Sequence, residues 1–409
     1  MNVRSVTCFA SIGEEPPSRT WAIREAGQLA DEARDGLESA GFPVQSTRLA
    51  TQPLSLLPGD PLDQAQELWS QCGESGFGYL SLGPVLADCA DASLSRLDRV
   101  AELIRATDSV FAGVLVARKG QGIHLAAIRR TAQIVSEIAH TTALGFGNLR
   151  LAMLANVGPH SPFFPAAYHD DGPPAVALAT ESAGLAVEAC SSAGSLSQAR
   201  HRLVTAIESA AREMVHCIRP LAERYGYRFA GIDFSLAPFP EEARSIGAAM
   251  ERLGVERFGA SGTLFAAAFL TDCLRRARYP RCGFSGLFLP VLEDQTMANR
   301  SREGLFSVND LLLYSTVCGT GLDVVPLPGN VSEDELAGIL LDVAALALRL
   351  DKPLTARLMP LPGKKAGDQT EFDFSYFANG CVLETKGLGC RGLFDRDDWL
   401  PDDEEHHDR

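Results

Sequence analysis

An aspartate and a serine lie near the end of a short apolar segment, residues 229–240, whose composition predicts a buried strand. Prolines close to its end stop the strand. Asp233 and Ser235 are two residues apart, so both side chains point to the same side of the strand. An ionisable carboxylate near a buried strand costs free energy unless a partner stabilises it. The pair therefore indicates a site. The alternative is a structural carboxylate that accepts hydrogen bonds from backbone amides.

The same pattern, an apolar segment followed by polar residues and a Pro/Gly loop, recurs elsewhere in the chain. In parallel α/β architectures, ligands bind beyond the carboxyl ends of the strands, where several loops converge. The further polar residues that such loops would bring together are His169, Asp170, Asp171, Glu293, Asp294, Cys318, Asp323, Lys364, Lys365, Asp368 and Glu371. The sequence thus predicts an active-site rim without identifying a reaction.

Several carboxylates and one histidine on a common rim would suit a hard divalent cation such as Mg²⁺, Ca²⁺ or Mn²⁺. We expect Asp233, Glu293 and Asp294 as metal ligands, and Asp233 and His169 as catalytic acid/base groups. The spacing matches no established metal motif. Helix capping or surface exposure is the alternative for Glu293 and Asp294, and loop hydrogen bonding is the alternative for His169.

Cys318 is the candidate nucleophile, because it lies in a Thr/Gly-rich turn after an apolar helix. A helix N-terminus or a cationic neighbour would be needed to lower its pKa, and the sequence shows no such neighbour directly. A buried, unreactive thiol is the alternative interpretation.

The glycine-bounded loop 362–368 contains two adjacent cations, Lys364 and Lys365, which suit a carboxylate or phosphate group. We expect Ser235, Lys364, Lys365 and Asp368 to bind a small anionic substrate, although a solvated loop is an equal alternative. The loop lacks the P-loop pattern. Residues 387–392 match GxGxxG, but only 17 residues follow, too few for a βαβ unit, so there is no nucleotide motif.

Strand-like and helical segments alternate along the chain, which predicts a mainly parallel sheet covered by helices. Predicted strands cover 3–12, 43–50, 77–82, 111–116, 149–157, 229–235, 283–291, 322–327 and 354–361. Predicted helices cover 21–40, 62–72, 94–107, 124–142, 197–225, 240–253, 263–276 and 332–350. The number of units favours an α/β barrel, closed or nearly so, as one domain over residues 1–395. An acidic tail, 396–409, is expected to be disordered.

Composition narrows the function classes. The 409 residues carry a net charge of -15, which argues against nonspecific nucleic-acid binding. No segment approaches the ~20 apolar residues of a membrane helix. The N-terminus lacks a signal-peptide pattern, and the ten cysteines lack regular spacing, so reduced thiols in the cytoplasm are expected. Residues 338–350 are apolar nearly all round, which suits either a homo-oligomer or burial in the outer ring of a barrel.

Six short motifs are distinctive: VRSVT (3–7), SPFFPAAYH (161–169), GIDFSLAP (231–238), GASGT (259–263), VCGTGLD (317–323) and PGKKAGD (362–368). Taken together, they resemble the DUF711 family of uncharacterised proteins. The resemblance implies a barrel similar to that of the pyruvate formate-lyase-like glycyl radical enzymes. In those enzymes a central cysteine attacks the substrate and a C-terminal glycine stores the radical. Cys318 is the nearest candidate for the first role. The sequence around Gly389 and Gly392 departs from the radical-glycine motif, so radical chemistry is not expected.

Two functional hypotheses follow. The first is a cytosolic enzyme that acts on a small anionic metabolite at the barrel mouth, with acid/base chemistry assisted by a divalent metal. The second is a non-catalytic protein that binds a metabolite, or regulates through it, on the same scaffold. The sequence names neither substrate nor reaction.

Overall fold

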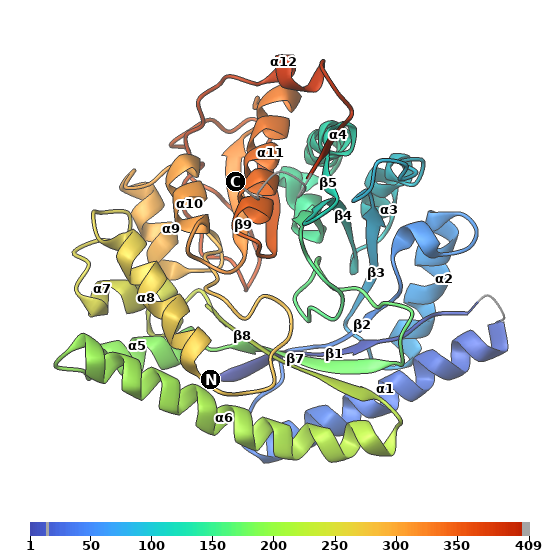
Figure 1. Ribbon diagram of the computed structural model, residues 1–409, viewed down its shortest axis with the longest axis horizontal. Helices are drawn as coiled ribbons and strands as arrows, with labels where there is room; N and C mark the ends of the chain where they lie inside the picture. Colours follow the sequence, from blue (N-terminus) through green and yellow to red (C-terminus); the bar gives the residue numbers. More distant parts are fainter. Residues whose placement is uncertain (14–15, 403–409) are drawn as a thin grey trace, which may run out of the picture.

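The computed structural model describes residues 1–13 and 16–402, in which eleven strands form one large mixed sheet (Figure 1). The strands are β1 (Asn2–Phe9), β2 (Thr47–Ala50), β3 (Tyr79–Leu86), β4 (Val110–Arg118), β5 (Gly122–His124), β6 (Leu151–Ala155), β7 (Ala175–Glu181), β8 (Arg228–Ala237), β9 (Gly321–Pro328), β10 (Leu354–Leu361) and β11 (Trp399–Pro401). The helices are α1 (Pro16–Ser39), α2 (Pro61–Glu74), α3 (Val100–Ala106), α4 (Leu125–Thr141), α5 (Ala183–Ser191), α6 (Leu196–Arg224), α7 (Ile246–Leu253), α8 (Thr263–Arg276), α9 (Gln295–Arg302), α10 (Val308–Ser315), α11 (Glu333–Arg349) and α12 (Arg391–Phe394). Figure 1 shows the sheet curving, with the long helices around its outside.

The main path of the sheet has the order β8-β7-β1-β2-β3-β4-β6-β10-β9 and contains two sets of parallel strands. β1, β2, β3, β4 and β6 are parallel to one another. β7 and β8 form one parallel pair, and β9 and β10 form another. The two sets run in opposite directions, because the β1–β7 and β6–β10 pairs are antiparallel. Each end of the sheet therefore combines the amino ends of one set with the carboxyl ends of the other.

The predicted α/β architecture with a mostly parallel sheet is confirmed, but a closed barrel is not observed. The hydrogen-bonded ladder ends at β8 and β9. Residues 281–290 make only isolated bridges to these edges, Ile232 with Arg281 and Pro290 with Asp323. The predicted strand over 283–291 is wrong, because Gly283 and Ser285 adopt positive φ angles of 60° and 40°, which interrupt an extended chain.

Local sequence patterns predicted the bounds of several other elements correctly. β10 covers the predicted range, and α11 begins after Ser332, whose side chain accepts a hydrogen bond from the Glu335 backbone amide at 3.1 Å. The helix predicted from residue 240 begins later, at Ile246, because Ser245 caps it through the Ala248 amide. The apolar α11 packs against α4, α10 and β10, so intramolecular burial accounts for its composition.

The C-terminal region was predicted as a disordered tail over 396–409. Residues 403–409 lie outside the described residues. Within the described part, β11 pairs antiparallel with β5, which pairs in turn with β4. No helix among the described residues is both long and apolar enough to cross a membrane.

The segment between β6 and β7 passes along the inside of the curved sheet, where residues 160–169 are buried (Figure 1). Hydroxyl groups on the strands bind its carbonyl oxygens. Thr7 Oγ1 donates to Pro162 O at 3.2 Å, and Ser81 Oγ donates to Ala167 O at 2.7 Å. A buried loop needs such partners for its backbone polar groups. Polar side chains inside this sheet therefore hold the loop in place.

Asp233 links β8 to residues 281–290. Its fully buried carboxylate accepts hydrogen bonds from the Ser235 amide at 3.0 Å, from the Phe284 amide at 2.7 Å and from the Ser285 amide at 3.0 Å. The Ser235 hydroxyl donates a fourth. Burial raises the pKa of Asp233 to about 6, although these donors favour the ionised form. The carboxylate thus replaces the strand pairing that residues 281–290 lack.

We predict that Asp233→Asn lowers the free energy of unfolding by about 2–3 kcal/mol, because an amide NH₂ would face a backbone N–H and leave buried donors unpaired. Chemical denaturation measures the difference. Asp373→Asn, at an exposed position, is the matched control. Equal stability of the two variants would show that Asp233 does not anchor the segment.

Candidate functional site: an arginine cavity

A cavity of about 210 Å³ lies at the end of the sheet where β1, β2, β3 and β4 begin. Its charged lining residues are Arg4, Arg48, Asp108, Arg150, Glu293 and Arg357. Its aromatic lining residues are Tyr79, Phe111, Phe146, Phe163, Phe164, Phe288, Phe374 and Tyr376. We call this space the arginine cavity. It combines cations with flat apolar surfaces, which is typical of sites for organic anions.

Two of the arginines belong to a buried ion network. Glu293, which is 3% exposed, pairs with Arg4 and, at 3.2 Å, with Arg357. Arg357 also donates two hydrogen bonds to Asp323, from Nε to Oδ1 at 2.6 Å and from Nη2 to Oδ2 at 2.8 Å. Arg4 further donates to the Pro238 carbonyl at 3.2 Å. These contacts connect β1 with β9 and β10, so the network ties both strand sets together.

Arg48 has no carboxylate within ion-pair distance among the described residues. Its Nε donates to Ser46 Oγ at 2.9 Å, and its guanidinium lies 5.4 Å from the Tyr79 ring centroid and 5.1 Å from that of Phe164. Burial and the neighbouring Arg4 lower the pKa of Arg48 to about 10, so it remains charged at neutral pH. The cation–π contacts hold the charge but do not neutralise it.

Arg150 likewise makes no ion pair with the carboxylates that the structure describes. It donates to the carbonyl oxygens of Ile104 at 2.7 Å and Val110 at 3.3 Å, and to the Thr107 hydroxyl at 3.3 Å. Burial lowers its pKa, with the nearby Asp108 acting in the opposite direction. Carbonyl oxygens fix this arginine in place and leave the cavity with an excess of positive charge.

The structure separates the predicted metal ligands. Glu293 lies in the ion network, whereas Asp233 anchors residues 281–290. Asp294 caps α9 through the Met297 amide at 2.9 Å and binds the start of α7 through Ser245 Oγ and the Ile246 amide, each at 2.6 Å. In the described chain, these three do not form a group of potential ligands within 4.8 Å of one another. Metal binding by them stays a prediction without a shared geometry.

The predicted substrate loop lies outside the arginine cavity. Lys364 pairs with Glu371 at 3.0 Å, and Lys365 is exposed. Asp368 accepts a hydrogen bond from the Lys365 backbone amide at 2.8 Å and so shapes the turn. None of these side chains lines the cavity, and neither does Ser235, which binds Asp233.

Cys318 is 2% exposed and belongs to the main hydrophobic core, also outside the cavity. A cation does lie beside it, since Lys352 Nζ donates to the Cys318 carbonyl at 2.6 Å. The contact goes to the backbone and fixes the turn before β9. A reactive thiol at this position stays a prediction.

Sequence reasoning missed the residues that define the cavity, namely Arg4, Arg48, Arg150 and Arg357. A usable signal was present. Arg4, Arg48 and Arg357 each lie inside a short strand whose residues are mostly buried, where an arginine is costly unless it is paired or faces a ligand.

A family model described as "Uncharacterised ACR (DUF711)" matches residues 1–378, which contain all four cavity arginines. The chain belongs to the DUF711 family. This confirms the resemblance seen in the sequence motifs.

Curated DUF711 relatives carry the name UPF0210 protein. One from Pyrobaculum arsenaticum is 34% identical over 364 residues, which cover 84% of this chain and 79% of the relative. One from Methanopyrus kandleri is 30% identical over 399 residues, with 91% and 88% covered. One from Acetivibrio thermocellus is 26% identical over 436 residues, with 98% and 94% covered. These names describe no activity.

We predict that Glu293→Gln destabilises this DUF711 protein by about 3 kcal/mol, because it leaves two buried arginines with one carboxylate fewer. Thermal and denaturant unfolding measure the loss. Glu188→Gln, on the exposed side of α5, serves as the control. A loss no larger than that of the control would mean that the ion network contributes little to the fold.

Proposed function

We propose that this DUF711 protein binds a small organic anion in the arginine cavity, with Arg48 as the principal counter-ion. The observation that carries the proposal is a charged guanidinium to which the described residues offer no carboxylate partner, held against Tyr79 and Phe164 in a cavity. Arg48 is half-buried, and a cation removed from much of its water is costly unless an anion neutralises it. A ligand carboxylate or phosphate would supply that anion and would bind the planar guanidinium through two oxygens.

The lining indicates the rest of the ligand. Eight aromatic side chains leave little room for a strongly hydrated body, so a flat or apolar body attached to the anionic group fits best. The volume of about 210 Å³ is below the roughly 300–1,000 Å³ of sites for drug-sized ligands. The ligand is therefore a metabolite of modest size.

The proposed site lies at one end of the curved sheet, whose edge strands β8 and β9 are bridged by residues 281–290. This end combines the amino ends of β1, β2, β3 and β4 with the carboxyl ends of the opposed strand set, so it matches the predicted carboxyl-end rim only in part. Glu293 is engaged by two arginines, so it is poorly placed as a catalytic base. The geometry of the arginine cavity therefore supports the metabolite-binding hypothesis more directly than metal-assisted acid/base catalysis. A test of catalysis first requires a known substrate.

We predict that Arg48→Met weakens binding of such an anion by about 10- to 100-fold, because a charged hydrogen-bond pair is lost while an unbranched stem like that of arginine is kept. Calorimetric titration with benzoate, phenyl phosphate and a short aliphatic dicarboxylate measures the affinity, and native mass spectrometry identifies any co-purified ligand.

Arg219→Met, an exposed arginine on α6, controls for loss of surface charge. Binding that is equally strong in wild type and Arg48→Met would overturn the proposal, as would the absence of heat and of thermal stabilisation with all three probes. A preference for the aliphatic dicarboxylate over both aromatic anions would overturn the assignment of an apolar body.

A further inference from the structure

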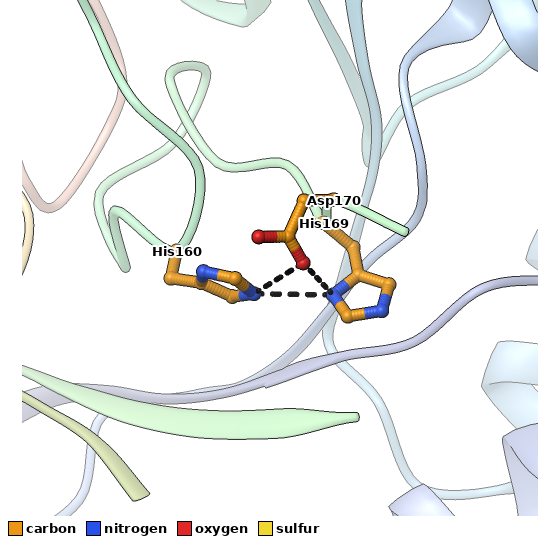
Figure 2. A group of neighbouring side chains, drawn as sticks. All are labelled: His160, His169 and Asp170. Carbon is orange, nitrogen blue, oxygen red and sulfur yellow. Dashed lines mark hydrogen bonds and ion pairs between the residues drawn. The ribbon is translucent and has the colours of Figure 1, made fainter. Parts of the chain in front are cut away.

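A second cluster lies at the opposite end of the first strand set, where β1 and β2 end. Figure 2 shows His160, His169 and Asp170 with one atom of each directed toward a common point. His160 Nε2 and His169 Nδ1 are 3.2 Å apart, and Asp170 Oδ1 is 3.4 Å from the first and 3.8 Å from the second. Among the described residues, this is the group of three potential metal ligands that the fold assembles.

We propose that His160, His169 and Asp170 bind a divalent transition-metal ion of the zinc class. Bonds of about 2.1 Å in a tetrahedral site place neighbouring ligand atoms about 3.4 Å apart, and the three observed separations fall around that value. An octahedral Mg²⁺ site would bring them to about 3.0 Å. Two imidazoles also favour zinc, copper, iron or nickel over the hard cations expected from the sequence.

The surroundings prepare His169 as a ligand. Its Nε2 lies 3.1 Å from the Gly172 carbonyl, so this nitrogen carries the proton and Nδ1 has a free electron pair toward the cluster. Backbone hydrogen bonds hold the main chain of both histidines in place: the His160 amide donates to Tyr168 O at 2.9 Å, and the His169 amide donates to Thr51 O at 2.8 Å.

Asp170 lies on the solvent side of the cluster, so a metal ion could reach the two histidines past it. The side chains of His160 and His169 are buried, whereas that of Asp170 is 41% exposed. An ion can therefore enter past the carboxylate, and three protein ligands leave a fourth tetrahedral position for water or substrate. This arrangement is typical of catalytic rather than structural zinc sites.

Arg228 contacts His160 and so affects which ring nitrogen of this histidine is free to bind a metal. Its Nη2 lies 3.1 Å from His160 Nδ1, which places the His160 proton on Nε2, toward His169. A metal at Nε2 requires that proton to move to Nδ1, where it would face the guanidinium. Arg228 is exposed at the start of β8, so it can turn into solvent. The arginine therefore competes with the ion, and removing it should strengthen binding.

The cluster is separate from the arginine cavity. The Phe9 ring, at the end of β1, packs edge-on against His160 at 5.2 Å, whereas Arg4 near the start of β1 lines the cavity. Five strand residues span about 16 Å. The metal proposal therefore does not depend on anion binding.

The test is calorimetric titration of the full, chelator-treated chain with Zn²⁺, with metal content measured after dialysis. We expect one ion per chain, and an affinity at least 10-fold lower in His160→Gln and in Asp170→Asn. The partly exposed Asp170→Asn variant keeps the test informative if His160→Gln fails to fold. His216→Gln, an exposed histidine on α6, is the matched control. A double variant, His406→Ala with His407→Ala, removes the histidine pair of the C-terminal sequence.

Arg228→Gln should bind Zn²⁺ more tightly than wild type, because the competing guanidinium is removed. The proposal is overturned if wild type takes up no Zn²⁺, if Asp170→Asn and a folded His160→Gln bind as wild type does, or if binding disappears in the C-terminal double variant. Weaker binding by Arg228→Gln would overturn the competition argument and favour a hydrogen-bonded histidine pair.

Discussion

Charge neutralisation inside the curved sheet is the constraint on which the rest of this structure depends. Glu293 and Asp323 neutralise Arg4 and Arg357, and their contacts connect β1 with β9 and β10. Such a network is costly to bury and still more costly to break. It thus fixes how the two strand sets face each other. Once those pairs are made, Arg48 remains charged and unpaired among the described residues. The arginine cavity therefore keeps a positive charge that a bound anion could neutralise.

The opposed strand sets explain why the molecule has two candidate sites. An all-parallel sheet gathers its functional loops at one end, but here each end holds carboxyl ends of one set. The arginine cavity lies where β1 begins, and the histidine cluster lies where β1 ends. The buried segment between β6 and β7 contributes to both, since Phe164 contacts Arg48 and His160 and His169 belong to the same segment.

Local patterns predicted much of the fold, because strands such as β10 and caps such as Ser332 depend on nearby residues. Strand direction and the gap at residues 281–290 depend on contacts between distant parts of the chain, which no local pattern contains. Asp233 was correctly expected to need a partner, and the structure supplies backbone amides from Phe284 and Ser285. His169 gained its partner His160, which Arg228 contacts in turn, only through folding. The arginines were missed because each was assigned to a predicted strand without asking what would neutralise its charge.

A crystal structure of the protein as purified, from crystals grown without carboxylate or phosphate buffers, tests the central claim most directly. The account predicts density for a small molecule in the arginine cavity, with two oxygen atoms within about 3 Å of the Arg48 guanidinium and an apolar body against Tyr79 or Phe164. The same density should appear after soaking with an aromatic carboxylate if the purified protein is empty. A cavity that holds only water after soaking, or an Arg48 turned out to solvent or paired with a protein carboxylate, would contradict the account.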